Sequence, residues 1–385
     1  MTAHAREILD HLVGFRTVSR DSNLDLIDWV ETYLAGHGVT AHRVWNHDRT
    51  KASLYANVGP MVEGGVVLSG HSDVVPVDGQ EWSSDPWTVT ERDGRLYGRG
   101  CADMKGFVAL ALAAVPLALK AGIKRPLQIA LSYDEELGCV GAPDMIAEMA
   151  RTLPRAAAVV VGEPSMMQLV DGHKGGHGGR VDVRGYEVHS SLMHRGVNAV
   201  MLGARLIDWA NRRNDENRAK PVTALAGLFD PPWTTLHVGT IRGGTAGNIT
   251  ARDCSFDLGM RVVPGEDPAA WLALVRAEID RLAQEAQAVR PEAGIDFDVT
   301  YFVPPLVPEA QGAAATLVHR LTGQNGTSVV SYGTEAGQFQ AEGYSAVVCG
   351  PGDIAQAHQP DEWIAVSQFE EGSRFMERLI AELAQ

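Results

Sequence analysis

Two histidines and several carboxylates, each set in a short polar motif, are the side chains of this sequence that could bind metal ions. In chain order they are His71, Asp73, Asp103, Glu135, Glu136, Glu163 and His358. Imidazole and carboxylate ligands without cysteine suit Zn²⁺, Mn²⁺ or Co²⁺, and the ligand types alone do not distinguish between these ions. Two such ions held about 3.5–4 Å apart usually share a bridging carboxylate and can acidify a water molecule between them.

The elements predicted around these residues would bring them to one edge of a sheet. Short runs that are apolar on both faces indicate central strands of a mostly parallel sheet covered by helices; they lie at 66–68, 127–131, 156–161 and 346–348. Three runs lead directly into histidine or glutamate, and His358 follows the fourth. Ligands bind at the carboxyl edge of such sheets, which favours a functional site over a rim of solvated loop residues.

Helical patterns supply the layers that would cover this sheet. Amphipathic helices are predicted at 5–18 and 24–35, and an apolar helix at 104–119. The most apolar stretch, 107–119, is shorter than the roughly 20 residues of a membrane span and contains Pro116, so we expect a buried core helix.

The middle of the chain has a different pattern, in which apolar and polar residues alternate. The alternation predicts strands with one solvated face at 181–184, 235–241, 254–261 and 295–302, separated by long helices at 198–213 and 268–287. This β-α-β-β-α-β order is typical of a ferredoxin-like α+β unit. We therefore predict a catalytic domain in two parts, 1–175 and 304–385, and an inserted lid domain at 176–303.

Composition excludes several classes of partner and suggests a compartment. Forty-eight acidic residues against 33 basic ones give a net charge of −15, which argues against nucleic acid or an anionic membrane as the main partner. Four separated cysteines with no CxxC motif suit a reducing compartment. We expect no signal peptide in the first ten residues and a cytoplasmic protein.

Taken together, the motifs resemble those of the dinuclear zinc amidohydrolase and exopeptidase family. The similarity covers nearly the whole chain in the family's order. It rests on His71-Ser-Asp-Val-Val-Pro-Val-Asp-Gly79, Asp85-Pro-Trp87, Gly94-Arg-Leu-Tyr-Gly-Arg-Gly100, Asp103-Met-Lys-Gly106, Asp134-Glu-Glu136, Gly162-Glu-Pro164, His189-Ser-Ser191 and Ala357-His-Gln-Pro-Asp-Glu362. The family resemblance implies a metal-dependent enzyme that hydrolyses linear amides.

The same resemblance implies a role for each candidate. His71 and Glu163 would bind one metal ion, Glu136 and His358 the other, and Asp103 would bridge the two. Glu135 would be the general base, taking a proton from the attacking water and passing it to the leaving amine. Asp73 would hydrogen-bond the ring nitrogen of His71 that does not bind metal. A cis peptide bond is expected between Asp103 and Met104.

Further residues of the inserted domain resemble family members' substrate contacts. His189 resembles a histidine that reaches the partner's active site across a dimer interface, which implies a homodimer paired through the lid domains. Arg261 and Asn248 resemble lid residues that contact substrate, and a guanidinium matches a carboxylate in geometry. The alternative is that each of these residues is a polar surface residue without a role in catalysis or binding.

Within the family the chain most resembles the members that hydrolyse N2-acetyl-L-ornithine to L-ornithine and acetate in arginine biosynthesis. The segment Tyr332-Gly-Thr-Glu-Ala336 carries that comparison, and Glu335 is the candidate partner for the δ-ammonium group, unless it only positions its loop. Alternatives are a succinyl-diaminopimelate desuccinylase, a broader N-acylamino-acid amidohydrolase or dipeptidase, and an inactive relative that binds amino-acid derivatives. Retention of all five ligands and Glu135 argues against the last.

Overall fold

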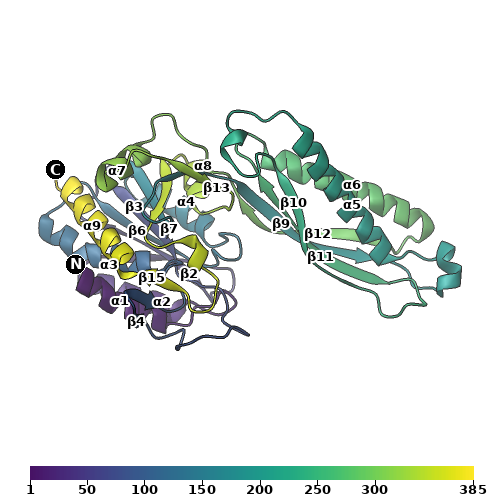
Figure 1. Ribbon diagram of the computed structural model, residues 1–385, viewed down its shortest axis with the longest axis horizontal. Coiled ribbons are helices and arrows are strands. Elements are labelled where there is room, and N and C mark those ends of the chain that lie inside the picture. The colour runs from purple at the N-terminus through teal and green to yellow at the C-terminus, as the bar shows by residue number, and fades with distance from the viewer. The chain divides into compact units, whose positions relative to one another are not determined.

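The computed structural model describes residues 1–385 and divides into two compact units (Figure 1). The first unit contains Met1–Gly172, Leu306–Val329 and Thr334–Gln385, and the second contains His173–Pro305 and Val330–Gly333. The sequence-based boundaries stood at 175/176 and 303/304. The structure thus assigns two separate stretches to the second unit, where the sequence suggested a single insertion.

An eight-stranded sheet forms the centre of the first unit, in the order β1-β2-β6-β3-β7-β14-β8-β13. Its strands are β1 Ala41–Trp45, β2 Ala52–Val58, β3 Val66–His71, β6 Leu127–Ser132, β7 Ala158–Pro164, β8 Val170–His173, β13 Ser328–Val330 and β14 Ala346–Gly350. The four central strands β6, β3, β7 and β14 are parallel, and β1, β2 and β8 pair antiparallel with their neighbours. This confirms the predicted α/β class with a mostly parallel central sheet.

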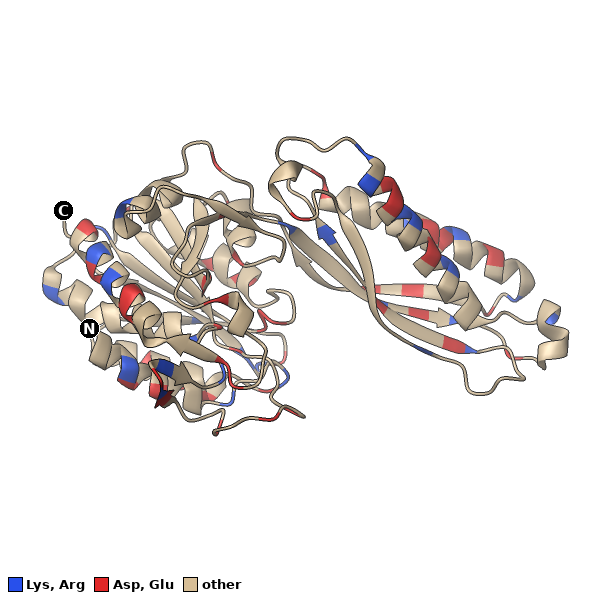
Figure 2. Cartoon of the chain, viewed as in Figure 1, with Lys and Arg blue, Asp and Glu red and all other residues tan.

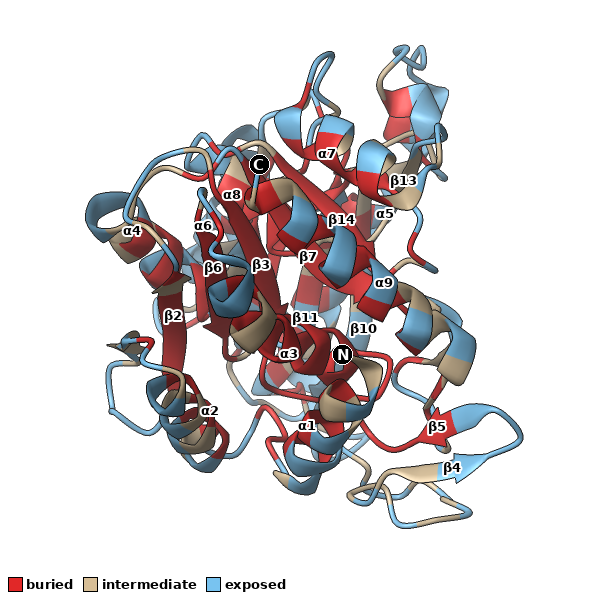
Figure 3. Ribbon diagram, turned by 90° about the vertical axis from the view of Figure 1, so that its left-hand side faces the viewer, coloured by how far each residue is buried: buried red, intermediate tan, exposed pale blue.

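Helices cover both faces of this sheet, which explains why its strands are apolar on both sides (Figure 3). One face packs against α1 Thr2–Gly14, α2 Leu24–Gly36, α3 Lys105–Ala121, α7 Ala313–Thr322 and α9 Val366–Leu383, whose apolar residues form one core. Alternate residues of β6 point away from that core, toward the side of α4 Ala142–Thr152 and α8 Ala336–Ala341. The expected central helix is thus α3, buried along most of its length.

A small three-stranded sheet, in the order β15-β5-β4, lies beside this core. It consists of β4 Thr90–Arg92, β5 Arg95–Tyr97 and β15 Trp363–Ala365, and the short 3-10 helix η3 spans Ile354–Gln356. Pairing of β15 with β5 joins the segment after His358 to the segment before Asp103.

The second unit is a four-stranded antiparallel sheet with two helices on one face (Figure 1). Its elements are β9 Gly175–Arg184, η1 Ser190–Arg195, α5 Ala199–Ala219, η2 Ala226–Leu228, β10 Thr235–Gly243, β11 Asp253–Val262, α6 Pro268–Val289 and β12 Gly294–Val303. The sheet order β10-β11-β9-β12 and the β-α-β-β-α-β chain order are those of a ferredoxin-like fold, as predicted.

Charged residues are concentrated on the outer faces of the two long helices of this unit, where both signs alternate (Figure 2). Arg205 pairs with Glu285 across the helices, and Arg281 pairs with Glu278 along α6. Ion pairs on a helix surface each contribute little to stability, so the buried apolar faces of α5 and α6 hold the unit together. No helix of the structure has the length and apolarity needed to cross a membrane.

Gly162 in β7 allows the close approach of the sheet and α3 just before Glu163. A Cβ atom at this position would lie 2.0 Å from Cγ of Phe107, whose ring is buried on α3. Only glycine therefore fits without displacing the ring, and the contact fixes the height of the strand end above the helix.

We predict that Gly162→Ala lowers the free energy of unfolding by about 1–3 kcal/mol, because the added methyl group overpacks the contact with Phe107. Chemical denaturation measures the change. Gly326→Ala is the matched control, since nothing lies within 4 Å of its Cβ position, and it should change stability by less than about 0.5 kcal/mol. Equal effects of the two substitutions would contradict the packing argument.

Candidate metal centre

The seven candidate residues all belong to the first unit and gather where its parallel strands end. His71 is the last residue of β3, Glu163 lies near the end of β7, and Glu135 and Glu136 follow β6. Asp103 lies two residues before α3, and the bond between Asp103 and Met104 is cis, as expected. Because parallel strands end at the same edge, residues far apart in sequence meet there.

The carboxylate of Asp103 lies between the two imidazoles. Its Oδ1 is 3.0 Å from Nε2 of His71, and its Oδ2 is 3.3 Å from Nε2 of His358. Each oxygen thus faces a different histidine, which is the arrangement a bridging carboxylate requires.

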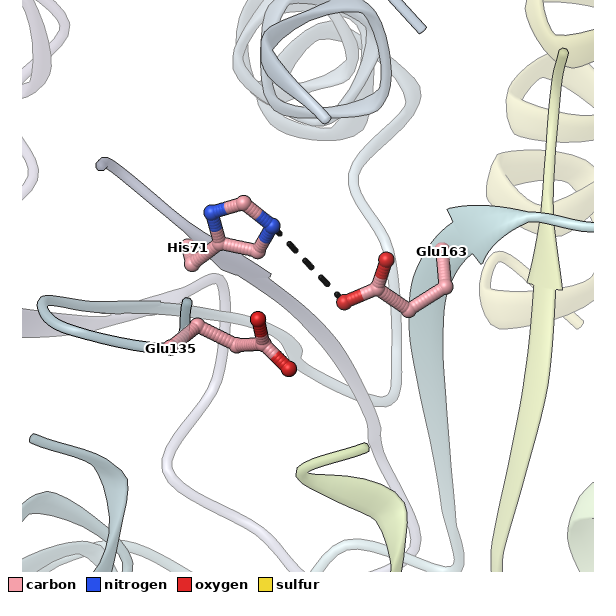
Figure 4. Close-up of side chains that lie close together, drawn as sticks. All are labelled: His71, Glu135 and Glu163. Atoms are coloured by element: carbon pink, nitrogen blue, oxygen red, sulfur yellow. Dashed lines mark ion pairs between the residues drawn. The ribbon is translucent and has the colours of Figure 1, made fainter. Parts of the chain in front are cut away.

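The two glutamates predicted as ligands each lie near a different histidine. Oε1 of Glu163 is 3.7 Å from Nε2 of His71, and Oε2 of Glu136 is 3.0 Å from Nε2 of His358. In Figure 4 the His71 ring faces Glu163, and the carboxylate of Glu135 lies beside both. Potential ligand atoms of His71, Glu135 and Glu163 lie within 4.8 Å of one another, as do those of His71, Asp103 and Glu136.

Burial of like charges perturbs the carboxylates strongly. Burial, together with the negative charges of Glu136 and Asp103, raises the pKa of Glu135 to about 8. Burial and the charge of Asp103 also raise the pKa values of Glu136 and Glu163 above the ordinary range. Carboxylates in such surroundings favour either protonation or a bound cation, because their mutual repulsion is not screened by water.

Asp103 and His358 have pKa values shifted in favour of their charged forms, unlike the glutamates. Although burial opposes it, hydrogen bonds from His358 and His71 lower the pKa of Asp103. Hydrogen bonds to Asp103 and Glu136 raise the pKa of His358 to about 10. Asp103 is therefore the carboxylate of the cluster that stays ionised most readily.

Two buried oxygens indicate that the cluster is built to hold cations. Oε1 of Glu136 and Oε1 of Glu163 are buried without a hydrogen-bond partner. An unpaired buried carboxylate oxygen is costly unless it coordinates a cation. The donor set of two imidazoles and three carboxylates therefore fits two divalent ions.

Asp73 supports the cluster in a different way from the one expected. Nδ1 of His71 lies 2.9 Å from the backbone carbonyl oxygen of Asp73, whereas the Asp73 carboxylate is 3.6 Å away. Oδ1 and Oδ2 of that carboxylate instead accept hydrogen bonds from the backbone N–H groups of Glu135 and Glu136, at 3.1 and 3.4 Å. The carbonyl oxygen fixes the histidine ring, and the carboxylate fixes the loop of the two glutamates.

Sequence reasoning assigned no role to Glu362, although this residue ends the motif that contains His358. Its carboxylate is fully buried, pairs with Arg99 at 2.7 Å and accepts the backbone N–H groups of Gly100, Ala102 and Asp103 at 2.9–3.1 Å. Glu362 therefore holds the loop that carries Asp103 in place. Its position in the motif was the only signal in the sequence.

The contacts of the Glu335 side chain favour a positioning role over the predicted binding of the δ-ammonium group. The side chain is completely buried at the N-terminus of α8, where Oε2 accepts a hydrogen bond from Ser69 at 3.0 Å and Oε1 accepts one from Ser132. Ser69 lies on β3 and Ser132 ends β6, so Glu335 joins the two strands that lead to His71 and Glu135. The alternative reading, in which Glu335 positions its surroundings, agrees with these contacts.

The predicted lid residues lie in the second unit, in two separate places. His189 and Asn248 are exposed and adjacent, since His189 forms a bridge with Ile249 and the carbonyl oxygen of Asn248 accepts the N–H of Ser190. Arg261 is exposed near the opposite end of β11. Eight residues of strand between Asp253 and Arg261 span roughly 27 Å, so one compact site on this unit does not include all three.

Known proteins that resemble this chain include a deacetylase and two metal-binding peptidases. An acetylornithine deacetylase from Myxococcus xanthus is 36% identical over 98% of this chain and 96% of that protein. An M20 family metallo-carboxypeptidase from Sulfolobus solfataricus shares the fold with a TM-score of 0.80 at 18% identity, over 99% of each chain. A dinuclear metal-binding M20 peptidase from Bacillus subtilis gives a TM-score of 0.60 at 12% identity, over 100% of this chain and 99% of that one.

The model of the peptidase family M20/M25/M40 matches residues 67–382, a range that contains every residue of the metal centre. The similarity to an acetylornithine deacetylase also extends over the crowded carboxylates at the end of the sheet. The chain is a metal-dependent hydrolase and belongs to peptidase family M20/M25/M40.

Proposed function

We propose that the protein hydrolyses the acetyl amide of N2-acetyl-L-ornithine to L-ornithine and acetate, a step of arginine biosynthesis. The observation that carries the proposal is the Asp103 carboxylate between His71 and His358, in a chain similar over its whole length to an acetylornithine deacetylase. Whole-length similarity at 36% identity supports the substrate, and the site geometry supports the reaction class.

The residues of the cluster divide into two sets of ligands. His71 and Glu163 would hold one divalent ion, Glu136 and His358 the other, and Asp103 both. Zn²⁺ is our first candidate, with Co²⁺ or Mn²⁺ as alternatives. When bound, the ions supply Lewis acidity toward the amide carbonyl and make the attacking water more acidic.

Glu135 moves the proton in this mechanism. Its carboxylate accepts a proton from the attacking water, and the same group delivers that proton to the nitrogen of the leaving amine. The backbone N–H of Glu135 is tied to Asp73, so the base is held at a fixed height beside His71. Bound cations would lower the pKa of Glu135 from its value in the protein alone and leave it ionised for this role.

The arrangement of the second unit supports a homodimer. Arg261 would bind the substrate carboxylate, whereas His189 and Asn248 lie too far from Arg261 within one unit to join the same site. We propose that His189 and Asn248 act on the active site of the partner subunit. The edge strand β10, and the exposed apolar side chains of Met193, Met201 and Ile241 in this unit, support such pairing.

Burial of Glu335 favours a second candidate function within the same reaction class. If Glu335 does not bind the δ-ammonium group, the site could accept other N-acyl amino acids. The second candidate function is therefore a broader N-acylamino-acid amidohydrolase. A cytoplasmic location is part of the proposal, supported by four buried, unpaired cysteines that suit a reducing compartment.

The substrate proposal predicts a clear order of rates. Zinc-loaded protein should hydrolyse N2-acetyl-L-ornithine with a kcat/KM at least about tenfold above those for N-acetyl-L-methionine and N-succinyl-diaminopimelate, a difference of about 1.4 kcal/mol. Product amine measured in parallel assays checks this. A preference for acetylmethionine would favour the broader amidohydrolase and overturn the substrate.

The proton-transfer role of Glu135 predicts that Glu135→Gln lowers kcat by about 10²–10⁴-fold, because the amide cannot accept the proton. Metal content measured by mass spectrometry should stay at the wild-type level, since the five predicted ligands are unchanged. Glu91→Gln, at an exposed position outside the cluster, is the control. Turnover retained in Glu135→Gln would contradict the mechanism.

The action of His189 on the partner's site is testable by mixing inactive subunits. His189→Ala and Glu135→Gln homodimers should each be nearly inactive. After subunits exchange, about half of the dimers contain one of each, and each mixed dimer has one intact site of two, so about a quarter of the activity should return. No recovery despite subunit exchange would place His189 in its own subunit's site, and His194→Ala is the control for the local surface.

A further inference from the structure

The thiol of Cys139 contacts the carboxylate of Glu135, and nothing in the mechanism above uses it. Sγ of Cys139 lies 3.3 Å from Oε1 of Glu135, within hydrogen-bond distance for sulfur. The cysteine is buried and forms no disulfide. Glu135 accepts no other side-chain hydrogen bond within the protein, so the thiol is its one side-chain donor.

A tight loop after β6 fixes the position of this sulfur. The backbone N–H groups of Gly138 and Cys139 both donate to the carbonyl oxygen of Glu135 at 2.8 Å, and Cys139 has a positive φ of 57°. Cys139 and Glu135 are thus closed into one hydrogen-bonded turn, in which the side chains meet on the same side.

A contact from α8 holds this turn from outside. Nε2 of Gln338 donates to the carbonyl oxygen of Cys139 at 3.0 Å, and Gln338 is itself buried. Asp73 holds the N–H groups of Glu135 and Glu136 from the other side. The backbone of both residues is therefore held on two sides, which keeps the sulfur within reach of the carboxylate.

The thiol keeps its proton and can donate it to an ionised Glu135. Burial and the negative charge of Glu135 raise the pKa of Cys139 well above its ordinary value, so the group remains S–H at neutral pH. With Oε1 engaged by the thiol, Oε2 is left for the proton of the attacking water.

We propose that Cys139 is a positioning residue that orients the carboxylate of Glu135 through an S–H···O hydrogen bond to Oε1. The inference rests on the proposed role of Glu135 as the base. The thiol contributes no ligand to the cluster and no proton to the reaction. Its effect is on the fraction of time that Oε2 points toward the attacking water.

Kinetics of three variants test the proposal. Cys139→Ala removes the donor and should lower kcat about tenfold with KM changed less than about twofold, because the freed carboxylate spends less time with Oε2 toward the attacking water. Cys139→Ser retains a donor and should recover kcat to within about threefold of wild type. Cys349→Ala, at another fully buried cysteine of this unit, should keep the wild-type kcat.

Two kinetic outcomes would overturn the proposal. Wild-type kcat in Cys139→Ala would show that the thiol is dispensable, and equal losses in Cys139→Ala and Cys139→Ser would show that the sulfur only fills space. Metal content and thermal unfolding of each variant identify losses caused by misfolding.

Infrared spectroscopy tests the contact directly in the folded, zinc-loaded full-length protein, in which Glu135 is proposed to be ionised. The difference between wild type and Cys139→Ser isolates the S–H stretching band of Cys139. That band should lie below those of the other three cysteines and should move to higher frequency in Glu135→Ala. An unshifted band would overturn the proposal even if Cys139→Ala fails to fold. Failure of the proposed function would appear differently, as turnover retained in Glu135→Gln with the band unchanged.

Discussion

Repulsion among four carboxylates in one water-poor space is the constraint on which the structure of this site depends. Asp103, Glu135, Glu136 and Glu163 meet beside His71, and burial raises the pKa of every glutamate in the group. Charges crowded in this way are stable only if protons or cations balance them. Two bound divalent ions would remove the repulsion and would at the same time provide the electrophile that the proposed amide hydrolysis needs.

Buried residues around the predicted ligands hold them in place through hydrogen bonds. Backbone N–H groups held by Asp73 and Glu362 fix the loops that carry Glu135 and Asp103, and Glu335 joins the strands that lead to His71 and Glu135. Each support is itself a buried acid whose charge is spread over hydrogen bonds. Such preorganisation keeps the ligands close together before any ion arrives, and an ion then needs little rearrangement to bind.

Much of this arrangement could be predicted from the sequence, because the apolar runs and the polar motifs that follow them are local signals. Strands continuous in valine and leucine predicted the central sheet, and the histidines and glutamates at their ends predicted the cluster. The partners of Asp73 and Glu335 could not be predicted, since they depend on which neighbouring loop reaches each oxygen after packing. Charge type suggested that Glu335 binds a cation, whereas its burial between two serines is a property of the tertiary structure. No local pattern in the sequence predicts that residues 330–333 belong to the second unit.

Anomalous X-ray diffraction from crystals of the zinc-loaded protein, recorded on both sides of the zinc absorption edge, tests the central claim most directly. We predict two anomalous peaks about 3.5–4 Å apart, with Asp103 between them, His71 and Glu163 on one ion and Glu136 and His358 on the other. A single peak, or two peaks that Asp103 does not join, would contradict the account.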